Sequence, residues 1–370
     1  MRPDFDRIQH IIGLTLIEGV GHVLAKRMIA YCGGPKEVFE EKANKLLLVP
    51  GVGDFVARMV VNSSKVLDRA AKEIEFCIKN NVSIHSYFDE KYPNRLKNCE
   101  DGPAFIFVKG NADLNAHRMI NIIGTREPSA YAKDFTEKLV SDLAPYGITI
   151  VSGMAYGIDI TAHRACLKNK VPTIGVVAHG LDRIYPQAHT NTATKMLEHG
   201  AVLSEFLTGN QPDKENFPKR NRVVAGMCDA TVVIETGVKG GSMITARLAN
   251  DYNRDVFALP GKPNDEKATG CNFMIKTNRA ALFENATDIA QTMNWELPTN
   301  GKPLTQTSLF IELTDEEKSV TNLLSTKGKM MIDHISGELA QPVSKVSVTL
   351  LNLEFKGAVR SLPGKQYELC

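Results

Sequence analysis

Short apolar segments alternate with helical stretches from Phe105 onward, and this alternation is the feature that most constrains the fold. Several segments are apolar on consecutive residues, which is typical of strands covered on both faces. The stretches between them, 131–143, 158–167 and 243–252, have apolar residues at helical spacing. The pattern predicts an extended Rossmann-like parallel sheet of the α/β class, whose ligands bind beyond the carboxyl ends of the strands. The expected strands are FIFVKG, MINIIGT, ITIVSG, TIGVVAHG, AVLSEF, ATVVIET and DVFALPG.

Glycine, hydroxyl and basic residues directly follow three of these strands. Glycine permits close approach of a backbone, and the first N–H groups of a helix attract an anion. We expect Ser242 both to cap its helix and to offer its hydroxyl to a ligand. A tight turn explains any single loop equally well, but three such loops in one sheet predict phosphate binding. The loops are Gly124-Thr125-Arg126, Ser152-Gly153-Met154-Ala155-Tyr156-Gly157 and 237–242, which ends in Gly240-Gly241-Ser242.

The range 214–222, KENFPKRNR, carries four cations against one anion and precedes an expected helix at VVAGMC. Lys and Arg displace counterions from phosphates, and Arg donates two N–H bonds to one phosphate. Phe217 and Tyr185 are candidates to stack on unpaired bases. The alternative interpretation is a solvated helix start, although the helix dipole disfavours cations at that end.

Motifs for enzymatic chemistry are weak in this sequence. GTREPS does not supply the Gly-x-Gly-x-x-Gly of a dinucleotide site, and GGSMIT lacks the Lys of a Walker loop. Asp159, His163 and Glu235 form a candidate acid–base set for a Rossmann-type nucleotide-binding hydrolase, which is the competing hypothesis. Asp159 and His163 are four residues apart, however, and could simply pair on one helix. We expect a binding protein without catalytic residues.

Composition excludes several other classes. The seven cysteines are scattered without a Cys-x-x-Cys pair, and no His-Glu-x-x-His occurs, so we expect no metal site and no cofactor. No apolar run reaches the length of a membrane span, and MRPDFDRIQH lacks the apolar core of a signal peptide, so we expect a cytoplasmic protein. The net charge is only +2, and a nucleic-acid site would therefore depend on local cations.

The flanking regions predict two further domains. Residues 1–85 are expected to be helical, with helix-hairpin-helix-like turns at 16–21 and 48–53, for which DNA binding and simple packing are equally supported. The Rossmann domain is expected at 92–295 and a linker at 296–312. Residues 313–370 contain three helices and a strand pair, which predict a winged helix. Its segment VSKVSVTLLNLEFKG is largely apolar, which favours a protein contact over base recognition.

With these segments in view, the chain resembles the DprA (Smf) family of DNA-processing proteins. The resemblance implies a single-stranded-DNA-binding recombination mediator of natural transformation, or competence. Such a protein protects incoming single-stranded DNA, loads RecA onto it, overcomes single-strand-binding protein and forms a homodimer through the Rossmann domain. No catalytic activity is implied. The segments that carry the resemblance are YPNRLK, IIGTREPSAYA, IVSGMAYGIDITAHRACL, GLDRIYPQAH, AVLSEF, NFPKRNRVVAGMCDATVVIET, GGSMITARLA and DVFALPGKP.

The resemblance also assigns residues. Arg126 matches the Arg of the family's Gly-Ser-Arg loop, a DNA contact. The family's basic segment corresponds to Lys219, Arg220 and Arg222, and its Gly-rich loop corresponds to the range 240–242.

Three positions depart from the family pattern. Tyr156 stands where Arg is usual, His179-Gly180 replaces a Gly pair, and Gly240 replaces a Ser. The Tyr removes a cation near the site, and this change puts affinity or base stacking in doubt. The complete predicted DNA-binding set is Gly124, Thr125, Arg126, Ser152, Gly153, Tyr156, Phe217, Lys219, Arg220, Arg222, Gly240, Gly241 and Ser242.

Overall fold

The structure is a computed structural model that describes residues 4–297, 313–356, 358–362 and 366–369. It forms two compact units, Met1–Leu297 and Pro298–Cys370. The first unit contains both the expected helical region and the expected Rossmann domain. Most of the expected linker, 298–312, lies outside the described residues. No described helix is long and apolar enough to cross a membrane.

Six helices form the N-terminal region, and they share a core with one edge of the sheet. Ile11 and Met28 from the helices lie in the same buried cluster as Phe105 and Phe107 from the sheet. This shared core explains why the two regions form one unit. Glycines with positive φ, Gly19 at +82° among them, turn the chain between helices. The helices are α1 (Phe5–Thr15), α2 (His22–Cys32), α3 (Pro35–Glu40), α4 (Ala43–Leu46), α5 (Asp54–Val61) and α6 (Ser64–Lys79).

The sheet of this unit has nine strands in the order β1-β2-β6-β5-β4-β3-β7-β8-β9. The seven strands from β6 to β9 in this order are parallel, which confirms the predicted Rossmann-like sheet. The strands are β1 (Val82–Ser86), β2 (Phe105–Gly110), β3 (Met119–Ile123), β4 (Thr149–Ser152), β5 (Thr173–Val176), β6 (Ala201–Ser204), β7 (Ala230–Val233), β8 (Asp255–Ala258) and β9 (Ala281–Leu282).

Strand β2, predicted as one of the parallel set, instead pairs antiparallel with both β1 and β6. Its burial explains the difference, because four of its six residues are buried on consecutive positions. The N-terminal helices cover one of its faces, so a strand near the edge acquires the apolar pattern of a central parallel one.

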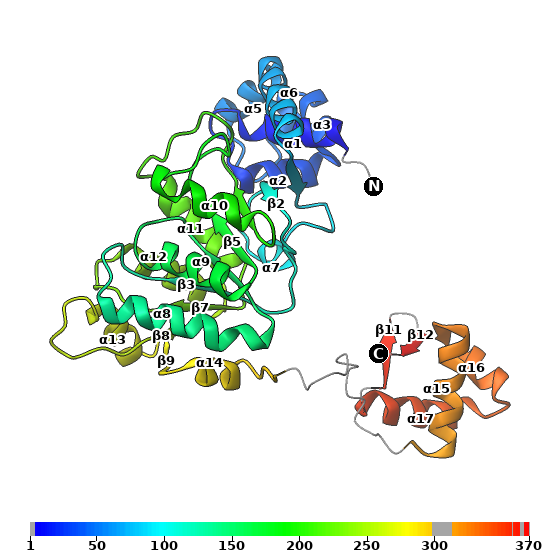
Figure 1. The fold of residues 1–370 in the computed structure, drawn as a ribbon. Helices are drawn as coiled ribbons and strands as arrows, with labels where there is room; N and C mark the ends of the chain where they lie inside the picture. Colours follow the sequence, from blue (N-terminus) through cyan, green and yellow to red (C-terminus); the bar gives the residue numbers. More distant parts are fainter. Residues whose placement is uncertain (1–3, 298–312, 357, 363–365, 370) are drawn as a thin grey trace. The chain divides into compact units, whose positions relative to one another are not determined.

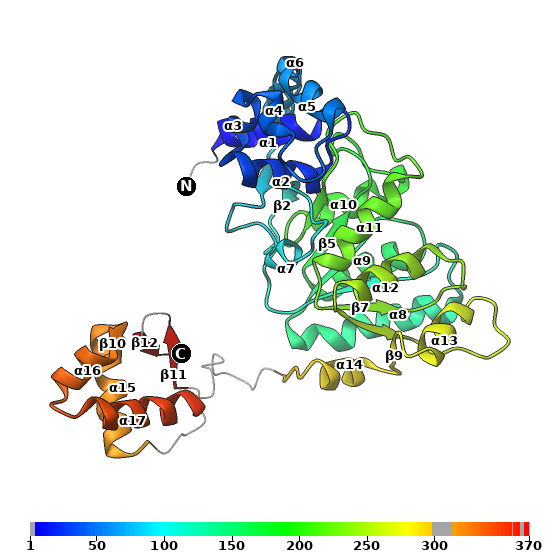
Figure 2. The same cartoon turned by 180° about the vertical axis from the view of Figure 1, so that it is seen from behind.

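Helices cover both faces of the sheet (Figures 1 and 2). One face packs on α8 (Ala130–Leu143), α9 (Ile158–Asn169), α10 (Thr190–Met196) and α14 (Ala286–Thr292). The other packs on α7 (Asn94–Lys97), α11 (Asn216–Gly226), α12 (Gly241–Asp251) and α13 (Thr269–Lys276). The chain adds β4, β5 and β6 on one side of β3 and then returns to add β7 on the other. Loops beyond β3 and β7 therefore flank a topological switch point, where such sheets bind ligands.

The second unit is a winged helix, as predicted. It consists of α15 (Asp315–Lys327), β10 (Met330–Met331), α16 (Ile332–Glu338), α17 (Val343–Phe355), β11 (Val359–Leu362) and β12 (Gln366–Leu369). Thr314 and Glu317 form a capping box at the start of α15, which satisfies the exposed N–H groups of its first turn. Lys356 donates to Glu317 at 2.7 Å and ties α17 to this cap.

Candidate nucleic-acid site

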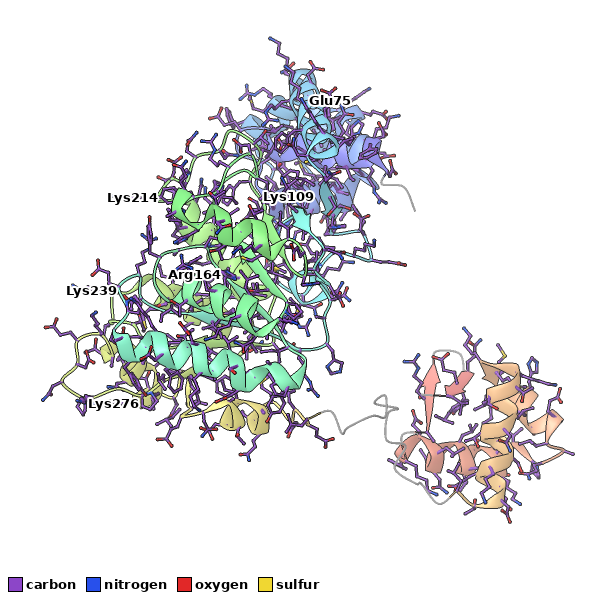
Figure 3. All side chains as sticks on the ribbon, in the orientation of Figure 1. Glu75, Lys109, Arg164, Lys214, Lys239 and Lys276 are labelled. Carbon is purple, nitrogen blue, oxygen red and sulfur yellow. The ribbon has the colours of Figure 1, made fainter. Side chains whose placement is uncertain are left out.

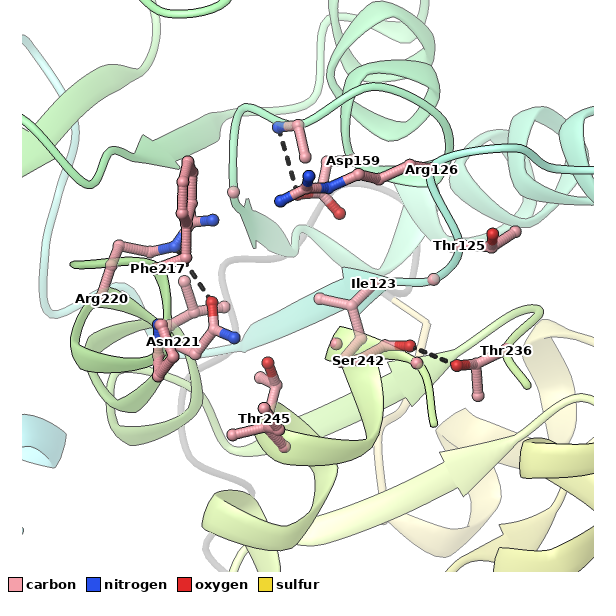
Figure 4. Close-up of a pocket in the computed structure, with 18 of the residues that line it drawn as sticks. Ile123, Thr125, Arg126, Asp159, Phe217, Arg220, Asn221, Thr236, Ser242 and Thr245 are labelled. Atoms are coloured by element: carbon pink, nitrogen blue, oxygen red, sulfur yellow. Dashed lines mark hydrogen bonds between the residues drawn. The ribbon is translucent and has the colours of Figure 1, made fainter. Parts of the chain in front are cut away.

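A cavity of about 540 Å³ opens at the carboxyl ends of β3, β4 and β7. Its walls are the loops that follow these strands and the first turns of α11 and α12 (Figure 4). We call it the phosphate cavity. The predicted residues that line it are Gly124, Thr125, Arg126, Gly153, Phe217, Arg220, Gly240, Gly241 and Ser242.

Arg126 and Phe217 meet across the mouth of the phosphate cavity. The guanidinium carbon of Arg126 lies 5.3 Å from the centre of the Phe217 ring, within the range of a cation–π contact. Arg126 is exposed and has no ion-pair partner among the described residues, so its N–H groups are available to an anion. Stacking on Phe217 fixes the direction of the guanidinium without consuming its donors.

Arg220 and Asp159 are both buried, and they converge on Gly153. A Cβ at position 153 would lie 2.4 Å from the Asp159 carboxylate and 2.6 Å from the Arg220 guanidinium, so any larger residue would displace at least one of these side chains. Arg220 donates from Nε to Asn221 at 3.1 Å and from Nη1 to the carbonyl of Val176. Burial lowers the pKa of Arg220 and raises the pKa of Asp159, and each charge opposes the shift of the other.

The start of α12 supplies backbone donors. The N–H groups of Gly241 and Ser242 have no acceptor among the described residues, and a Cβ at Gly241 would meet open space. Free N–H groups at the start of a helix form an anion site. Ser242 does not cap the helix as expected: Gly240 is the N-cap residue, and the Ser242 hydroxyl donates to Thr236 at 2.7 Å. That bond pins the loop after β7 to the helix.

Only part of the basic range 214–222 lines the phosphate cavity, and the helix there begins earlier than the sequence predicted. The helix begins at Asn216, not at VVAGMC, so Lys219, Arg220 and Arg222 lie on its first turns and Lys214 precedes it. Successive residues of a helix rotate by 100° and cannot all face one cavity. Lys214 and Arg220 line the cavity, whereas Lys219 is exposed outside its lining. Arg222 pairs with Glu205 and donates to the Asp101 carbonyl, which gives it a structural role in this conformation.

Two more predicted residues lie outside the phosphate cavity. Ser152 is fully buried, and its hydroxyl donates to the Ile122 carbonyl at 2.7 Å, which ties β4 to β3. Tyr156 lines an adjoining pocket of about 40 Å³ together with Tyr185, and Arg126 and Phe217 belong to both cavities. We call it the aromatic pocket. About half of each Tyr side chain is exposed. The hydrogen-bond donors of the phosphate cavity and the exposed aromatic rings are therefore adjacent.

The candidate acid–base set is not assembled. His163 is fully buried, with Nε2 2.7 Å from the Gly153 carbonyl and Nδ1 2.7 Å from the Thr173 hydroxyl. Glu235 accepts from the backbone N–H and hydroxyl of Ser129, the N-cap of α8, at 2.8 and 2.7 Å. Asp159 alone of the three lines the cavity. His163 and Glu235 thus hold the loops that carry Gly153 and Arg126.

Sequence reasoning did not assign Lys214, Thr236 and Thr245, which also line the phosphate cavity. A signal existed for two of them, because Lys214 belongs to the basic range and Thr236 ends the expected strand segment ATVVIET. Thr245 lies within a helix and has no local signal.

Comparison with known proteins identifies the family. The family model described as DNA recombination-mediator protein A matches residues 83–294, and the DprA winged helix domain model matches 307–365. The fold and these matches together define a Rossmann-like DNA-processing protein with an appended winged helix. The chain belongs to the DprA (Smf) family.

Relatives match over most of their length. The Smf protein of Synechocystis is 30% identical over 95% of this chain and 96% of its own. DprA of Bacillus subtilis is 39% identical over 58% of this chain and 71% of its own. The structure of DprA from Streptococcus pneumoniae covers 80% of this chain and 99% of its own, with 29% identity and a TM-score of 0.67. DprA of Helicobacter pylori, described for its single-stranded DNA binding mode, covers 58% of this chain and 97% of its own, with 31% identity and a TM-score of 0.53.

Proposed function

We propose that this protein binds single-stranded DNA, with the phosphodiester backbone in the phosphate cavity. The observation that carries the proposal is the convergence of Arg126, Lys214 and Arg220 with the free N–H groups at the start of α12. Arg126 and Arg220 donate to phosphate oxygens, and Lys214 contributes charge at the rim. Figure 3 shows Lys214 and Lys239 projecting along the same margin of the unit.

Unpaired bases occupy the neighbouring aromatic pocket. Tyr156 and Tyr185 are exposed beside Arg126, and aromatic rings stack on any base without reading its identity. Duplex DNA hides the faces of its bases, so this arrangement favours single strands. Tyr156 stands where the family pattern has an Arg, so a stacking surface replaces a cation near the site, and this change shifts affinity from salt-dependent to stacking interactions.

Binding of this kind supports the role of a recombination mediator in natural transformation. In this role the protein acts in the cytoplasm as a homodimer through its Rossmann domain, protects incoming single-stranded DNA and loads RecA onto it against single-strand-binding protein. Family membership supports these partners. The direct assay is RecA filament formation on DNA coated with single-strand-binding protein, with and without this protein.

The DNA-binding proposal is tested by fluorescence anisotropy of a labelled single strand and its duplex across salt concentrations. We expect Arg126→Glu and Lys214→Glu each to weaken binding and to reduce the salt slope by about 0.7 for each phosphate that is no longer neutralised. Lys276→Glu, an exposed lysine outside both cavities, is the matched control. Unchanged affinity in Arg126→Glu, or a preference for the duplex, would contradict the proposal.

The competing hydrolase is separated by a different measurement. Mass spectrometry of the purified protein would reveal a copurified nucleotide, and a turnover assay would reveal its hydrolysis. Turnover that disappears in Asp159→Asn or Glu235→Gln would support the enzyme. We expect neither a copurified nucleotide nor turnover, because Glu235 is already committed to Ser129.

A further inference from the structure

A second basic cavity, of about 850 Å³, lies between α9 and α10, away from the phosphate cavity. Val171 and Thr173 at the start of β5 and Gly200 before β6 line it, so it opens at the amino ends of these strands. We call it the α9/α10 cavity. None of its lining residues belongs to the phosphate cavity or to the aromatic pocket. Figure 3 shows Arg164, one of its residues, on the face of the sheet that carries α9 and α10.

Positive charge gathers at the α9/α10 cavity. One carboxylate, Glu198, lines it against four permanent cations and a histidine. Lys168 lies 3.9 Å from Glu137, whereas the side chains of the other three cations have no hydrogen-bond or ion-pair partner in the part of the chain that the structure describes. The basic residues are Arg164, Lys168, Lys170, Lys195 and His199.

Helix dipoles explain only part of this cluster. Lys168 and Lys195 lie in the last turns of α9 and α10, where a cation is favoured. Lys170 is the C-cap residue of α9 and lies at the same helix end, whereas Arg164 is in the middle of α9, where the dipole does not favour a cation. Unpaired like charges around one cavity repel each other, and a bound polyanion relieves this repulsion.

The two helices connect this cavity to the DNA site. Helix α9 begins directly after the loop that carries Tyr156, and α10 begins shortly after Tyr185 and Pro186 of the aromatic pocket. The helices pack on each other through Ile160, Ala193 and their neighbours. Both helices therefore lead from the aromatic pocket toward the cavity, and the twelve residues of α9 span about 18 Å. A few nucleotides of extended strand cover such a distance.

We propose that the α9/α10 cavity is a second phosphate-binding site, which holds the backbone of the same single strand after it leaves the aromatic pocket. This inference rests on the proposed DNA binding and extends its footprint. A short oligonucleotide fills the phosphate cavity alone, whereas a longer one occupies both cavities. Affinity for DNA therefore increases once the strand is long enough to reach the α9/α10 cavity.

The test compares binding of a thymidine dinucleotide, which is too short to reach from one cavity to the other, with that of an oligothymidylate of about 25 nucleotides, which exceeds the usual site size of one binding domain. In the double variant Arg164→Glu/Lys195→Glu we expect unchanged binding of the short strand. The long strand should bind at least tenfold more weakly, and its salt slope should be lower by about 1.4, because two phosphates are no longer neutralised. Thermal unfolding of the full chain verifies that the variant is folded.

Lys79→Glu/Lys276→Glu is the matched control, because both lysines are exposed, lie in the last turns of their helices and line none of the three cavities. An equal loss of affinity in this control, or unchanged binding of the long strand in the test variant, would overturn the second site. Arg126→Glu separates the proposed function from the second site. If this variant binds both strands with unchanged affinity, the proposed DNA binding in the phosphate cavity fails, whatever Arg164→Glu/Lys195→Glu shows.

Discussion

Asp159 is the residue whose charge opposes the proposed ligand most directly. It lines the phosphate cavity beside Arg126 and Arg220, and burial raises its pKa while Arg220 acts in the opposite direction. Its Oδ2 accepts from the Ala155 N–H at 3.3 Å, so the carboxylate also shapes the loop after β4. Asp159 therefore stabilises the loop after β4 and at the same time repels a phosphate in the cavity.

We expect Asp159→Asn to bind single-stranded DNA about fivefold more tightly at neutral pH, because removal of one nearby like charge is worth about 1 kcal/mol. In the wild type, affinity should rise as pH falls toward the raised pKa of Asp159, since the protonated carboxyl no longer repels phosphate. This dependence should be flatter in the variant. Anisotropy titrations across pH measure both, with the exposed Asp134→Asn as control. Weaker binding by Asp159→Asn would show that the loop geometry dominates.

His163 makes stability depend on pH. Burial lowers its pKa to about 4 in the folded chain, from 6.5 when exposed. The folded chain holds the imidazole of His163 in its neutral form. The contribution of this residue to the free energy of unfolding is therefore fully present above pH 6.5 and is lost as pH falls toward 4. Linkage gives a loss of about 2 kcal/mol at pH 5. Urea unfolding at pH 7.5 and at pH 5 gives the difference in the free energy of unfolding between the two pH values. In His163→Gln we expect this difference to be smaller by about 2 kcal/mol. An identical difference in both proteins would contradict this role.

At the scale of elements, the starts of α9 and α12 use glycine for different reasons. Gly157 has φ +84°, and a Cβ there would lie 2.1 Å from the Thr125 carbonyl oxygen. Gly241 has an ordinary backbone and nothing within 4 Å of a Cβ. The first glycine is required by the fold, whereas the second leaves space in the cavity.

Alanine substitutions should separate these reasons. Gly157→Ala is expected to cost about 3 kcal/mol or more, because it combines backbone strain with a clash in the Arg126 loop, and to abolish DNA binding. Gly241→Ala should unfold at the same or a higher denaturant concentration yet bind single-stranded DNA more weakly, since its methyl group occupies the place of a phosphate. Chemical denaturation and anisotropy test both. Wild-type affinity in Gly241→Ala would remove the α12 N–H groups from the site.

The whole molecule consists of two compact units, and the described part of the winged helix has an apolar surface of its own. Val348, Leu351 and Phe355 of α17 are exposed, and Phe355 is 83% exposed. They lie at helical spacing on the face away from the buried Val346 and Leu350. The helix that would read a DNA groove is therefore apolar on its exposed side, which favours a protein partner.

A chain that ends at Leu297 should retain the single-stranded DNA affinity of the full protein, because the residues that line all three cavities lie in the first unit. We expect the truncation to reduce RecA loading instead, if the winged helix contacts a protein. Parallel anisotropy and RecA filament assays distinguish the two effects, and Leu351→Ser in the full chain should reproduce the loading defect. Loss of DNA binding on truncation would place the DNA site elsewhere.

Local patterns anticipated much of the fold and part of the site. Consecutive apolar residues identified the strands, and glycine loops after β3, β4 and β7 identified the cavity, because both features are set by a few neighbouring residues. The site was less predictable where the direction of a side chain depends on its position around a helix. Lys219, Arg220 and Arg222 look alike in sequence, yet they end in solvent, in the cavity and in an ion pair with Glu205.

By itself, the sequence determined the doubly wound sheet, the glycine-rich loops that follow its strands and the winged helix, since strand burial, tight turns and helix starts depend on local chemistry. Only the tertiary structure decided which charges meet. Gly153 brings together Asp159 and Arg220, which are 61 positions apart in the chain. It also decided that β2 pairs antiparallel and that the α9/α10 cavity collects unpaired cations, because strand direction and convergence depend on contacts between distant segments.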